Sequence, residues 1–303
     1  MTTFTLPARL PFNYLSVVNS HGWRQLAPFD FDQSTSMLSY VLRASNGRVM
    51  QINMNDSKAG VAVDIKGKLS KLEASEVKEA VTWMFALDAD YSSFYKAARK
   101  EPKLKKAIQF AHGRVLRSPT LFEDVVKTIL TTNTLWSATK NMTKKLIASF
   151  GDPLQRPVPP AIQLREELKA FPTAERIAAS SPEVLKEAVR VGYRAPALHQ
   201  LAVRVASGEL DLESLRRSNL PTLDLRKELL KINGVGPYAA ANLLLILGRS
   251  DFIPIDSWAL KLVSHEWYKG KPVTAREVEK AFEKWGEYRG LAFWFWDWKY
   301  QGG

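Results

Sequence analysis

The segment LRKELLKINGVGPYAAANLLLILGRSDFIPIDSWALKLV, residues 225–263, decides the fold. Apolar residues recur at helical spacing on both sides of the tight turn Asn233-Gly234-Val235-Gly236, so the sequence predicts two helices joined as a hairpin. The glycines tolerate positive φ, and Pro237 fits the first position of the second helix, where its missing N–H costs nothing. The free N–H groups of that helix would point out of the turn, which suits a DNA phosphate; the alternative is an ordinary pair of antiparallel helices.

A short apolar segment follows the hairpin and ends at an aspartate. Phe252-Ile253-Pro254-Ile255 leads to Asp256, which lies twenty residues after Gly236. Aspartate is a typical N-cap, and SWALKLV behind it predicts a helix, so a structural role alone would explain this residue. A capping carboxylate is also fixed in position and can face a cleft, so we expect Asp256 to be catalytic as well.

These two features together resemble the helix-hairpin-helix DNA glycosylase superfamily. I-x-G-V-G-P-Y-A-A-A-N followed by I-P-I-D is similar to the hairpin and catalytic aspartate of that family in pattern and spacing. In its bifunctional members a lysine two residues after the last hairpin glycine attacks the sugar C1′, and here that position is Tyr238. The resemblance therefore implies a monofunctional enzyme that leaves an abasic site. Asp256 would stabilise positive charge developing on the deoxyribose and orient or deprotonate the attacking water.

A second motif lies upstream, in SPTLFEDVVKTILTTNTLWSATKNMTKKL, residues 118–146. It predicts two amphipathic helices broken by a polar turn and resembles the family segment whose turn enters the minor groove. In that resemblance Asn133 fills the hole left by the flipped nucleotide, although it could instead only cap the next helix. VGYRAPALHQLA, residues 191–202, also resembles a helix start of the family, and we expect Tyr193 and Arg194 to pack structurally.

Aromatic residues are the candidates for gripping a flipped base. They are dense near the C-terminus, where Phe293-Trp294-Phe295-Trp296-Asp297-Trp298 places aromatics on every side of a helix, so most of them are expected in the core. We expect one or two to line the base pocket, with Trp294 and Phe295 as candidates, together with Tyr238 and Trp136.

Hydrophobic periodicity divides the chain into a sheet region and a helical region. Segments such as LSYVLRA and VAVDI alternate with period two between residues 4 and 70, and the period becomes helical from about Ser75. We predict a mostly α fold with an N-terminal antiparallel β-domain: residues 1–75 form the sheet domain and residues 76–303 two helical sub-bundles with the active site in the cleft between them. The proline-rich stretch 151–160 predicts a loop between the helical blocks.

Composition limits the partners and the chemistry. The 43 Lys and Arg residues exceed the 31 Asp and Glu residues by 12, which favours a polyanionic partner, here expected to be double-stranded DNA containing a damaged base. The absence of cysteine excludes disulfides, thiolate zinc sites and iron–sulfur clusters. The four histidines share no ligand spacing, so we assign no metal and no cofactor, leaving open a structural monovalent or divalent cation at the hairpin.

The sequence shows no long apolar run, so we expect a cytoplasmic monomer that makes no membrane contact, nucleoid-associated if bacterial. The function predicted first is excision of an alkylated purine, favoured by the three-part layout and the aromatic C-terminus. Asn133 and the G-Y-R-A motif favour an oxidised purine, and a deaminated purine is a further alternative. Two other classes stay open: a non-catalytic helix-hairpin-helix DNA-binding module, which would not need Asp256, and a basic helical scaffold.

Overall fold

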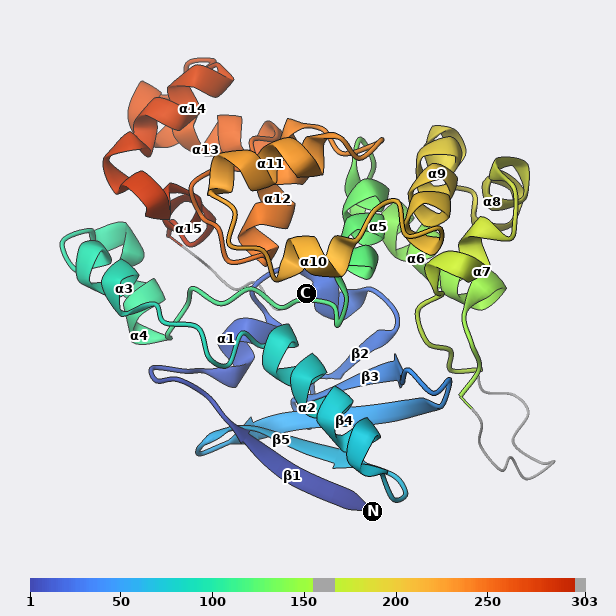
Figure 1. Ribbon diagram of the computed structural model, residues 1–303. Coiled ribbons are helices and arrows are strands. Elements are labelled where there is room, and N and C mark those ends of the chain that lie inside the picture. Colours follow the sequence, from blue (N-terminus) through green and yellow to red (C-terminus); the bar gives the residue numbers. More distant parts are fainter. Residues whose placement is uncertain (155–166, 298–303) are drawn as a thin grey trace.

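The computed structural model describes residues 1–154 and 167–297 and combines a five-stranded sheet with a larger helical part (Figure 1). The predicted fold class, mostly α with an N-terminal antiparallel β-domain, is confirmed. The greater part of the predicted loop 151–160 lies outside the described residues, as does Trp298 at the end of the aromatic run.

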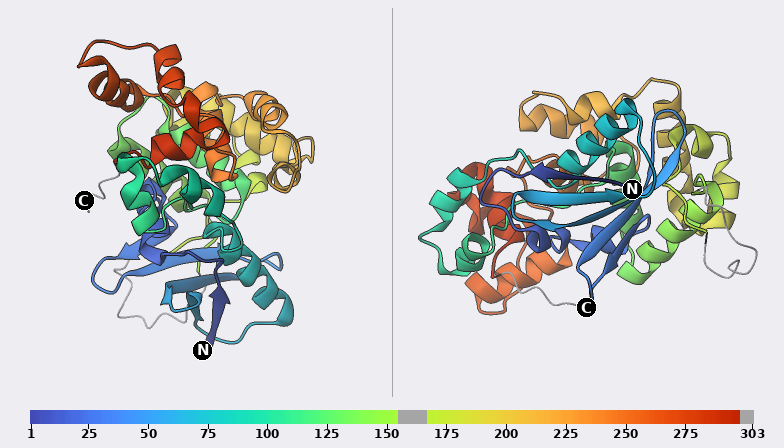
Figure 2. Two further views of the ribbon diagram at one scale, coloured as in Figure 1. Left: turned by 90° about the vertical axis from the view of Figure 1, so that its left-hand side faces the viewer. Right: turned by 90° about the horizontal axis from the view of Figure 1, so that it is seen from below.

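The sheet is antiparallel throughout, with the strand order β1-β5-β4-β3-β2. Alternate side chains of β4 and β5 are buried, among them Ile52, Met54 and Val63, as the period-two pattern requires. The sheet lies at one end of the molecule and the helices rise from it (Figure 2). The strands are β1 (Thr2–Pro7), β2 (Phe29–Asp32), β3 (Met37–Arg43), β4 (Val49–Ser57) and β5 (Gly60–Ile65).

The α-helices follow the sheet in sequence, apart from α1, which precedes β2. Those of the described residues are α1 (Tyr14–Val18), α2 (Lys71–Met84), α3 (Ser92–Ala98), α4 (Lys105–Gln109), α5 (Leu121–Thr131), α6 (Trp136–Phe150), α7 (Ala174–Ala178), α8 (Pro182–Val189), α9 (Ala195–Ala206), α10 (Leu212–Arg216), α11 (Thr222–Leu230), α12 (Pro237–Ile246), α13 (Ser257–Tyr268), α14 (Ala275–Ala281) and α15 (Arg289–Trp294). Short 3₁₀ turns include η1 (Gly22–Gln25), η2 (Pro102–Leu104), η4 (Gly192–Arg194) and η5 (Glu283–Tyr288).

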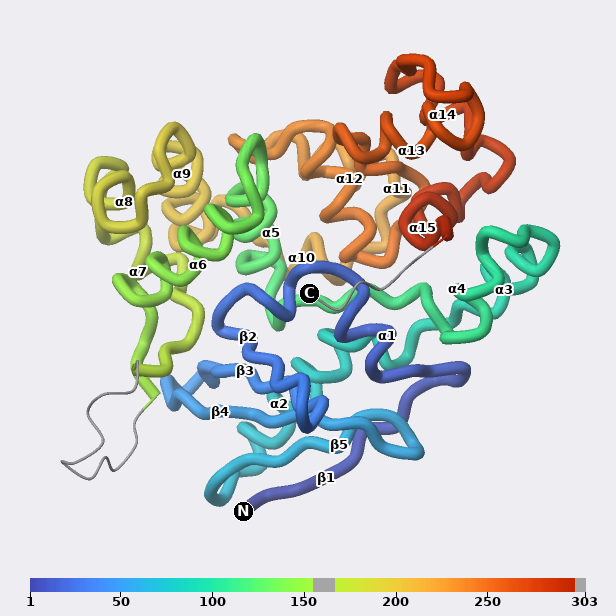
Figure 3. The backbone as a smooth tube through the Cα atoms, turned by 180° about the vertical axis from the view of Figure 1, so that it is seen from behind, coloured from blue at the N-terminus to red at the C-terminus, as the bar shows by residue number. Residues whose placement is uncertain are grey.

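Two large hydrophobic cores hold most of these elements, beside a small cluster of Val41, Val49 and Ala170. One core joins the sheet to α1–α4 and to the C-terminal helices α13–α15, and Figure 3 shows α3 and α4 beside α15. The other core is built from α5 to α12. Helix α12 takes part in both, because Leu243 and Leu244 pack in the second core while Leu245 and Ile246 pack in the first. The predicted boundary at residue 75 falls within α2, and the division into domains stays a prediction.

Candidate active site

The predicted hairpin joins α11 to α12. Gly234 has φ +85°, and a Cβ there would lie 3.1 Å from the Ala197 Cβ, so both the backbone conformation and the close approach favour glycine. The Val235 side chain is buried in the second core and anchors the turn. Gly236 precedes α12 with nothing within 4 Å of its Cβ position. The hairpin backbone is therefore held from one side and open to solvent on the other.

Asp256 is the N-cap of α13. Its Oδ1 accepts hydrogen bonds from the backbone N–H groups of Trp258 and Ala259, both at 2.9 Å. Its other carboxylate oxygen accepts none from the residues that the structure describes. The capping role considered from the sequence is thus present, and it leaves one oxygen of a rigidly held carboxylate exposed.

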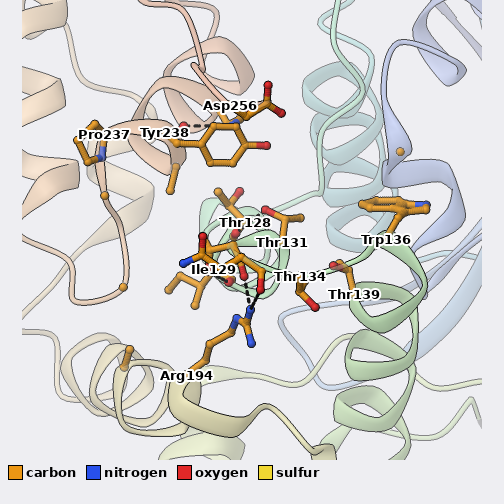
Figure 4. Close-up of a pocket in the computed structure, with 18 of the residues that line it drawn as sticks. Thr128, Ile129, Thr131, Thr134, Trp136, Thr139, Arg194, Pro237, Tyr238 and Asp256 are labelled. Atoms are coloured by element: carbon orange, nitrogen blue, oxygen red, sulfur yellow. Dashed lines mark hydrogen bonds between the residues drawn. The ribbon is translucent and has the colours of Figure 1, made fainter. Parts of the chain in front are cut away.

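A cavity of about 930 Å³ lies in front of Asp256. Figure 4 shows Asp256 and Tyr238 on one side of it, Trp136 on the opposite side, and the end of α5 between them. The lining residues come from segments that lie far apart in the sequence: His21, Gly22, Trp23, Thr128, Ile129, Thr131, Thr132, Asn133, Thr134, Trp136, Thr139, Tyr193, Arg194, Ala197, Asn233, Gly234, Gly236, Pro237, Tyr238, Ala239, Asn242, Ile255, Asp256, Ser257 and Trp294.

Three of the four predicted pocket residues line this cavity, namely Tyr238, Trp136 and Trp294. Phe295 does not, because its side chain is fully buried and stacks on His112 with ring centroids 5.1 Å apart. The side chains of neighbouring residues at the end of a short helix point in different directions. Trp294 therefore lines the cavity, whereas Phe295 packs in the hydrophobic core.

Tyr238 occupies the position discussed above for a lysine, and its side chain lies near Asp256. Burial raises the pKa of the Tyr238 phenol, and the negative charge of Asp256 raises it further. The phenol is therefore protonated at neutral pH. The Tyr238 carbonyl accepts a hydrogen bond from the Asn242 side chain at 3.1 Å, one turn further along α12.

The polar turn between α5 and α6 carries Asn133 at its tip, exposed and with φ +46°. The Arg194 guanidinium donates hydrogen bonds to the carbonyls of Thr132 and Asn133. Dashed lines at the labelled Arg194 mark these bonds in Figure 4. Arg194 therefore packs and pairs structurally, as predicted. Tyr193 differs, since it is 67% exposed and its hydroxyl accepts a hydrogen bond from the Asn133 amide at 3.4 Å.

A family model described as "HhH-GPD superfamily base excision DNA repair protein" matches residues 126–287, more than half of the chain. The chain belongs to this superfamily. The match begins within α5 and includes the polar turn, the hairpin and Asp256. The resemblance seen in the sequence is confirmed, and the protein is a DNA glycosylase of the HhH-GPD superfamily.

Individual relatives agree with the family. The DNA-3-methyladenine glycosylase of Bacillus subtilis is 27% identical over 225 residues, which are 72% of this chain and 71% of the relative. The structure titled "MBOgg1 in complex with low affinity DNA ligand" has a TM-score of 0.74 at 26% identity, covering 97% of this chain and 94% of that one. The 3-methyladenine DNA glycosylase of Archaeoglobus fulgidus shares the fold, with a TM-score of 0.73 at 19% identity, covering 98% and 97%.

One wall of the glycosylase cavity was not found from the sequence. It consists of His21, Gly22 and Trp23, which lie before the sheet strands β2–β5. Gly22 lies close against the Trp136 indole, and a Cβ at this glycine would overlap the ring. The only local signal was the aromatic pair around a glycine, H-G-W, and nothing nearby in sequence shows that it faces Asp256.

A buried polar network on α5 supports this wall. The Trp23 Nε1–H donates to the Asp124 carboxylate at 2.7 Å, and Asp124 is fully buried. Burial raises the pKa of Asp124 to about 7, against lowering by the Trp23 and Ser118 hydrogen bonds and the Lys127 charge. Beside it, the buried Lys127 pairs with Glu123 at 2.6 Å. Trp23 is therefore fixed by an acid that belongs to the helix forming the cavity floor.

In residues 1–154 and 167–297, no group of three or more His, Asp or Glu side chains could hold a metal ion. No helix in the same ranges has both the length and the apolar character needed to span a membrane.

Proposed function

We propose that this glycosylase excises alkylated purines from double-stranded DNA by hydrolysis of the N-glycosidic bond, without cutting the strand. The aromatic lining of the cavity carries the proposal. Trp136, Tyr238 and Trp294 surround a space that also holds the Asp256 carboxylate, and Trp23 and His21 complete the wall. Alkylation at N3 or N7 gives a purine a positive charge, and electron-rich ring faces attract such a cation.

Asp256 would supply the hydrolytic chemistry. One oxygen is occupied by the start of α13, and the other is available to stabilise positive charge on the deoxyribose and to orient or deprotonate water. The alkylated purine is cationic before cleavage and takes the bonding electron pair, so it departs as a neutral base without needing a strong general acid and leaves the positive charge on the deoxyribose. This accounts for a site in which one exposed carboxylate faces the cavity.

The absence of strand cleavage follows from the lack of an amine. Tyr238 occupies the position at which bifunctional relatives in the sequence resemblance carry a lysine. Among the described residues that line the cavity, none is a lysine. A phenol cannot form a Schiff base with the sugar, so base release would leave an intact abasic strand.

DNA would approach the open side of the hairpin and the exposed turn. The hairpin backbone Asn233–Gly236 would bind a phosphate, and Asn133 would occupy the space vacated by the flipped nucleotide. Arg194 donates hydrogen bonds to the carbonyls of Thr132 and Asn133 in the turn between α5 and α6. These bonds would keep Asn133 at the tip of the turn while it enters the DNA.

Excision of an oxidised purine is the second candidate function. The observation that favours it is the polar residue Asn133 at the tip of the turn, since the sequence resembles oxidised-purine glycosylases there. 8-Oxoguanine is neutral, so the aromatic lining would give it no cation–π attraction, and hydrogen bonds to the base edge would have to provide recognition.

A panel of labelled duplexes tests both functions. Each duplex carries one lesion: 3-methyladenine, 7-methylguanine, hypoxanthine, 8-oxoguanine or uracil. Products are resolved with and without hot alkali, and borohydride is added in parallel to trap any Schiff base. We expect strand breaks only after alkali, only for the alkylated purines, and no trapped adduct. Release of 8-oxoguanine alone would replace the first function with the second, and borohydride trapping would refute hydrolysis as the sole chemistry.

A further inference from the structure

His21 is a polar side chain in the aromatic wall that the proposed chemistry does not use. Its ring lies against Trp23, with centroids 4.4 Å apart, and near the edge of Trp294, at 6.4 Å. The residue lines the cavity, so part of the imidazole is reachable by a bound base.

One hydrogen bond fixes which ring nitrogen carries the proton. The His21 Nε2 lies 2.5 Å from the backbone carbonyl of Leu116. A carbonyl oxygen can only accept, so Nε2 must be the donor and carries the hydrogen. In a neutral imidazole, Nδ1 is then an acceptor with a free lone pair. Nδ1 has no hydrogen-bond partner among the residues that the structure describes.

The imidazole is neutral at physiological pH. Burial, helped by the positive charge of Lys127, lowers the pKa of His21 to about 4 against the opposing effect of the Leu116 carbonyl. The only ring nitrogen of His21 that is left for a bound base is therefore an acceptor and not a donor.

The ring is also held in place before any base arrives. Leu116 is bound at both of its backbone groups, because its N–H donates to the Ser20 hydroxyl at 2.9 Å while its carbonyl binds His21. The Ser20 carbonyl in turn accepts the Trp294 indole N–H at 2.9 Å. An acceptor fixed in this way loses little freedom on binding and discriminates well between donors and acceptors.

We propose that His21 determines base specificity by accepting, at Nδ1, a hydrogen bond from the exocyclic amine of the flipped alkylated purine. This inference rests on the proposed function and deepens it. An amine at the base edge pairs with the Nδ1 lone pair, whereas a carbonyl oxygen in the same place would face that lone pair and be repelled. The site thereby favours alkylated adenine over its deaminated counterpart.

Two free bases of the same shape test the inference: 3-methyladenine and 3-methylhypoxanthine, which has oxygen in place of the amine and a hydrogen on its imidazole ring. Each is used as a competitive inhibitor of excision by the wild-type enzyme and by His21→Gln. Glutamine can still donate to the Leu116 carbonyl, but its acceptor Oε1 is bonded to the same carbon as the donor nitrogen and does not take the position of Nδ1. His199→Gln is the matched control, since the His199 Nε2 bonds the Ser180 carbonyl at 2.9 Å and does not line the cavity.

We expect the wild type and His199→Gln to bind 3-methyladenine about tenfold more tightly than 3-methylhypoxanthine, and His21→Gln to bind the two equally. The ratio of inhibition constants is insensitive to a general loss of stability. An unchanged ratio in His21→Gln, or no preference in the wild type, would refute the role of His21.

An NMR experiment on the wild type gives an answer that does not depend on the variant folding or on excision. The chain has four histidines, so ¹⁵N-histidine labelling gives few signals, which variants of the other three assign. The His21 Nδ1 signal should shift with 3-methyladenine and stay in place with 3-methylhypoxanthine; the reverse, or no shift, overturns the proposal. A wild type that releases no alkylated purine refutes the proposed function, whereas release of alkylated purines with an unchanged ratio refutes only the role of His21.

Discussion

The two walls of the cavity are built in different ways. The wall of the hairpin and Asp256 comes from one stretch of the chain, and its key groups are backbone and a helix cap. The opposite wall, His21 to Trp23, is held by residues about a hundred positions away, including Leu116 and Asp124. Chemistry that needs an exposed, fixed carboxylate can thus be encoded locally, whereas the shape that selects a base is assembled by long-range contacts.

The largest effect is expected on the hairpin wall, from Asp256→Asn. Asparagine caps a helix as well as aspartate does, so the fold and DNA binding should persist while the negative charge is lost. We expect single-turnover excision to fall on the order of 10³-fold. Asp251→Asn, in the adjacent turn outside the cavity, is the control and should keep wild-type activity. Near-wild-type excision by Asp256→Asn would show that the carboxylate is not catalytic.

The corresponding disruption of the opposite wall is Gly22→Ala. The added methyl group would overlap the Trp136 indole and push it into the cavity or out of its place. We expect a loss of about 1–3 kcal/mol in the free energy of unfolding, measured by urea denaturation, and a marked fall in excision with the DNA dissociation constant little changed. An unaltered free energy of unfolding in Gly22→Ala would mean that the Trp136 side chain can move aside without loss of packing.

The buried Asp124 carboxyl group that binds Trp23 predicts that the stability of the fold depends on pH. Asp124 has its pKa raised from 3.8 to about 7 in the folded chain, so between these values the folded state binds a proton that the unfolded state releases. Stability should therefore fall as pH rises through this window, by at most about 1.4 kcal/mol per pH unit, and Asp124→Asn should remove that slope.

The comparison of Asp124→Asn with the wild type matters because other groups titrate nearby. His21 and His112 have pKa values lowered to about 4, so their contribution to stability rises with pH up to their ordinary value of 6.5. Subtracting the urea-derived stability curves of wild type and variant isolates Asp124. A flat difference curve from pH 4 to 7 would place its pKa near the ordinary value.

The smallest effect is expected for Gly236→Ala in the hairpin. Its φ of −88° is open to any residue and no atom lies within 4 Å of the new Cβ, so the melting temperature should not change. A methyl group on the open side of the turn would hold a phosphate away from the backbone, and we expect roughly threefold to tenfold weaker DNA binding by fluorescence anisotropy. Unchanged binding would mean that the phosphate lies elsewhere.

The contrast between the walls also explains what the sequence could predict. The hairpin, Asp256 and the turn around Asn133 are local patterns, and the switch from period two to helical period marks the sheet and the helices. Trp294 and Phe295 were proposed together, but only the packing of α15 decides which of them faces the cavity. His21 and Trp23 carry no local sign of their place, because their positions depend on bonds to Leu116 and Asp124.

The hydrogen bond from Trp294 to the Ser20 carbonyl spans 274 positions of the chain. During synthesis the ribosome makes Ser20 and His21 long before Trp294, so the wall that selects the base gains this brace only after the chain between them has been made. The hairpin and Asp256 also follow long after His21. A nascent chain therefore has no complete base pocket before Trp294 has emerged, and newly made protein becomes able to act on DNA only after that point.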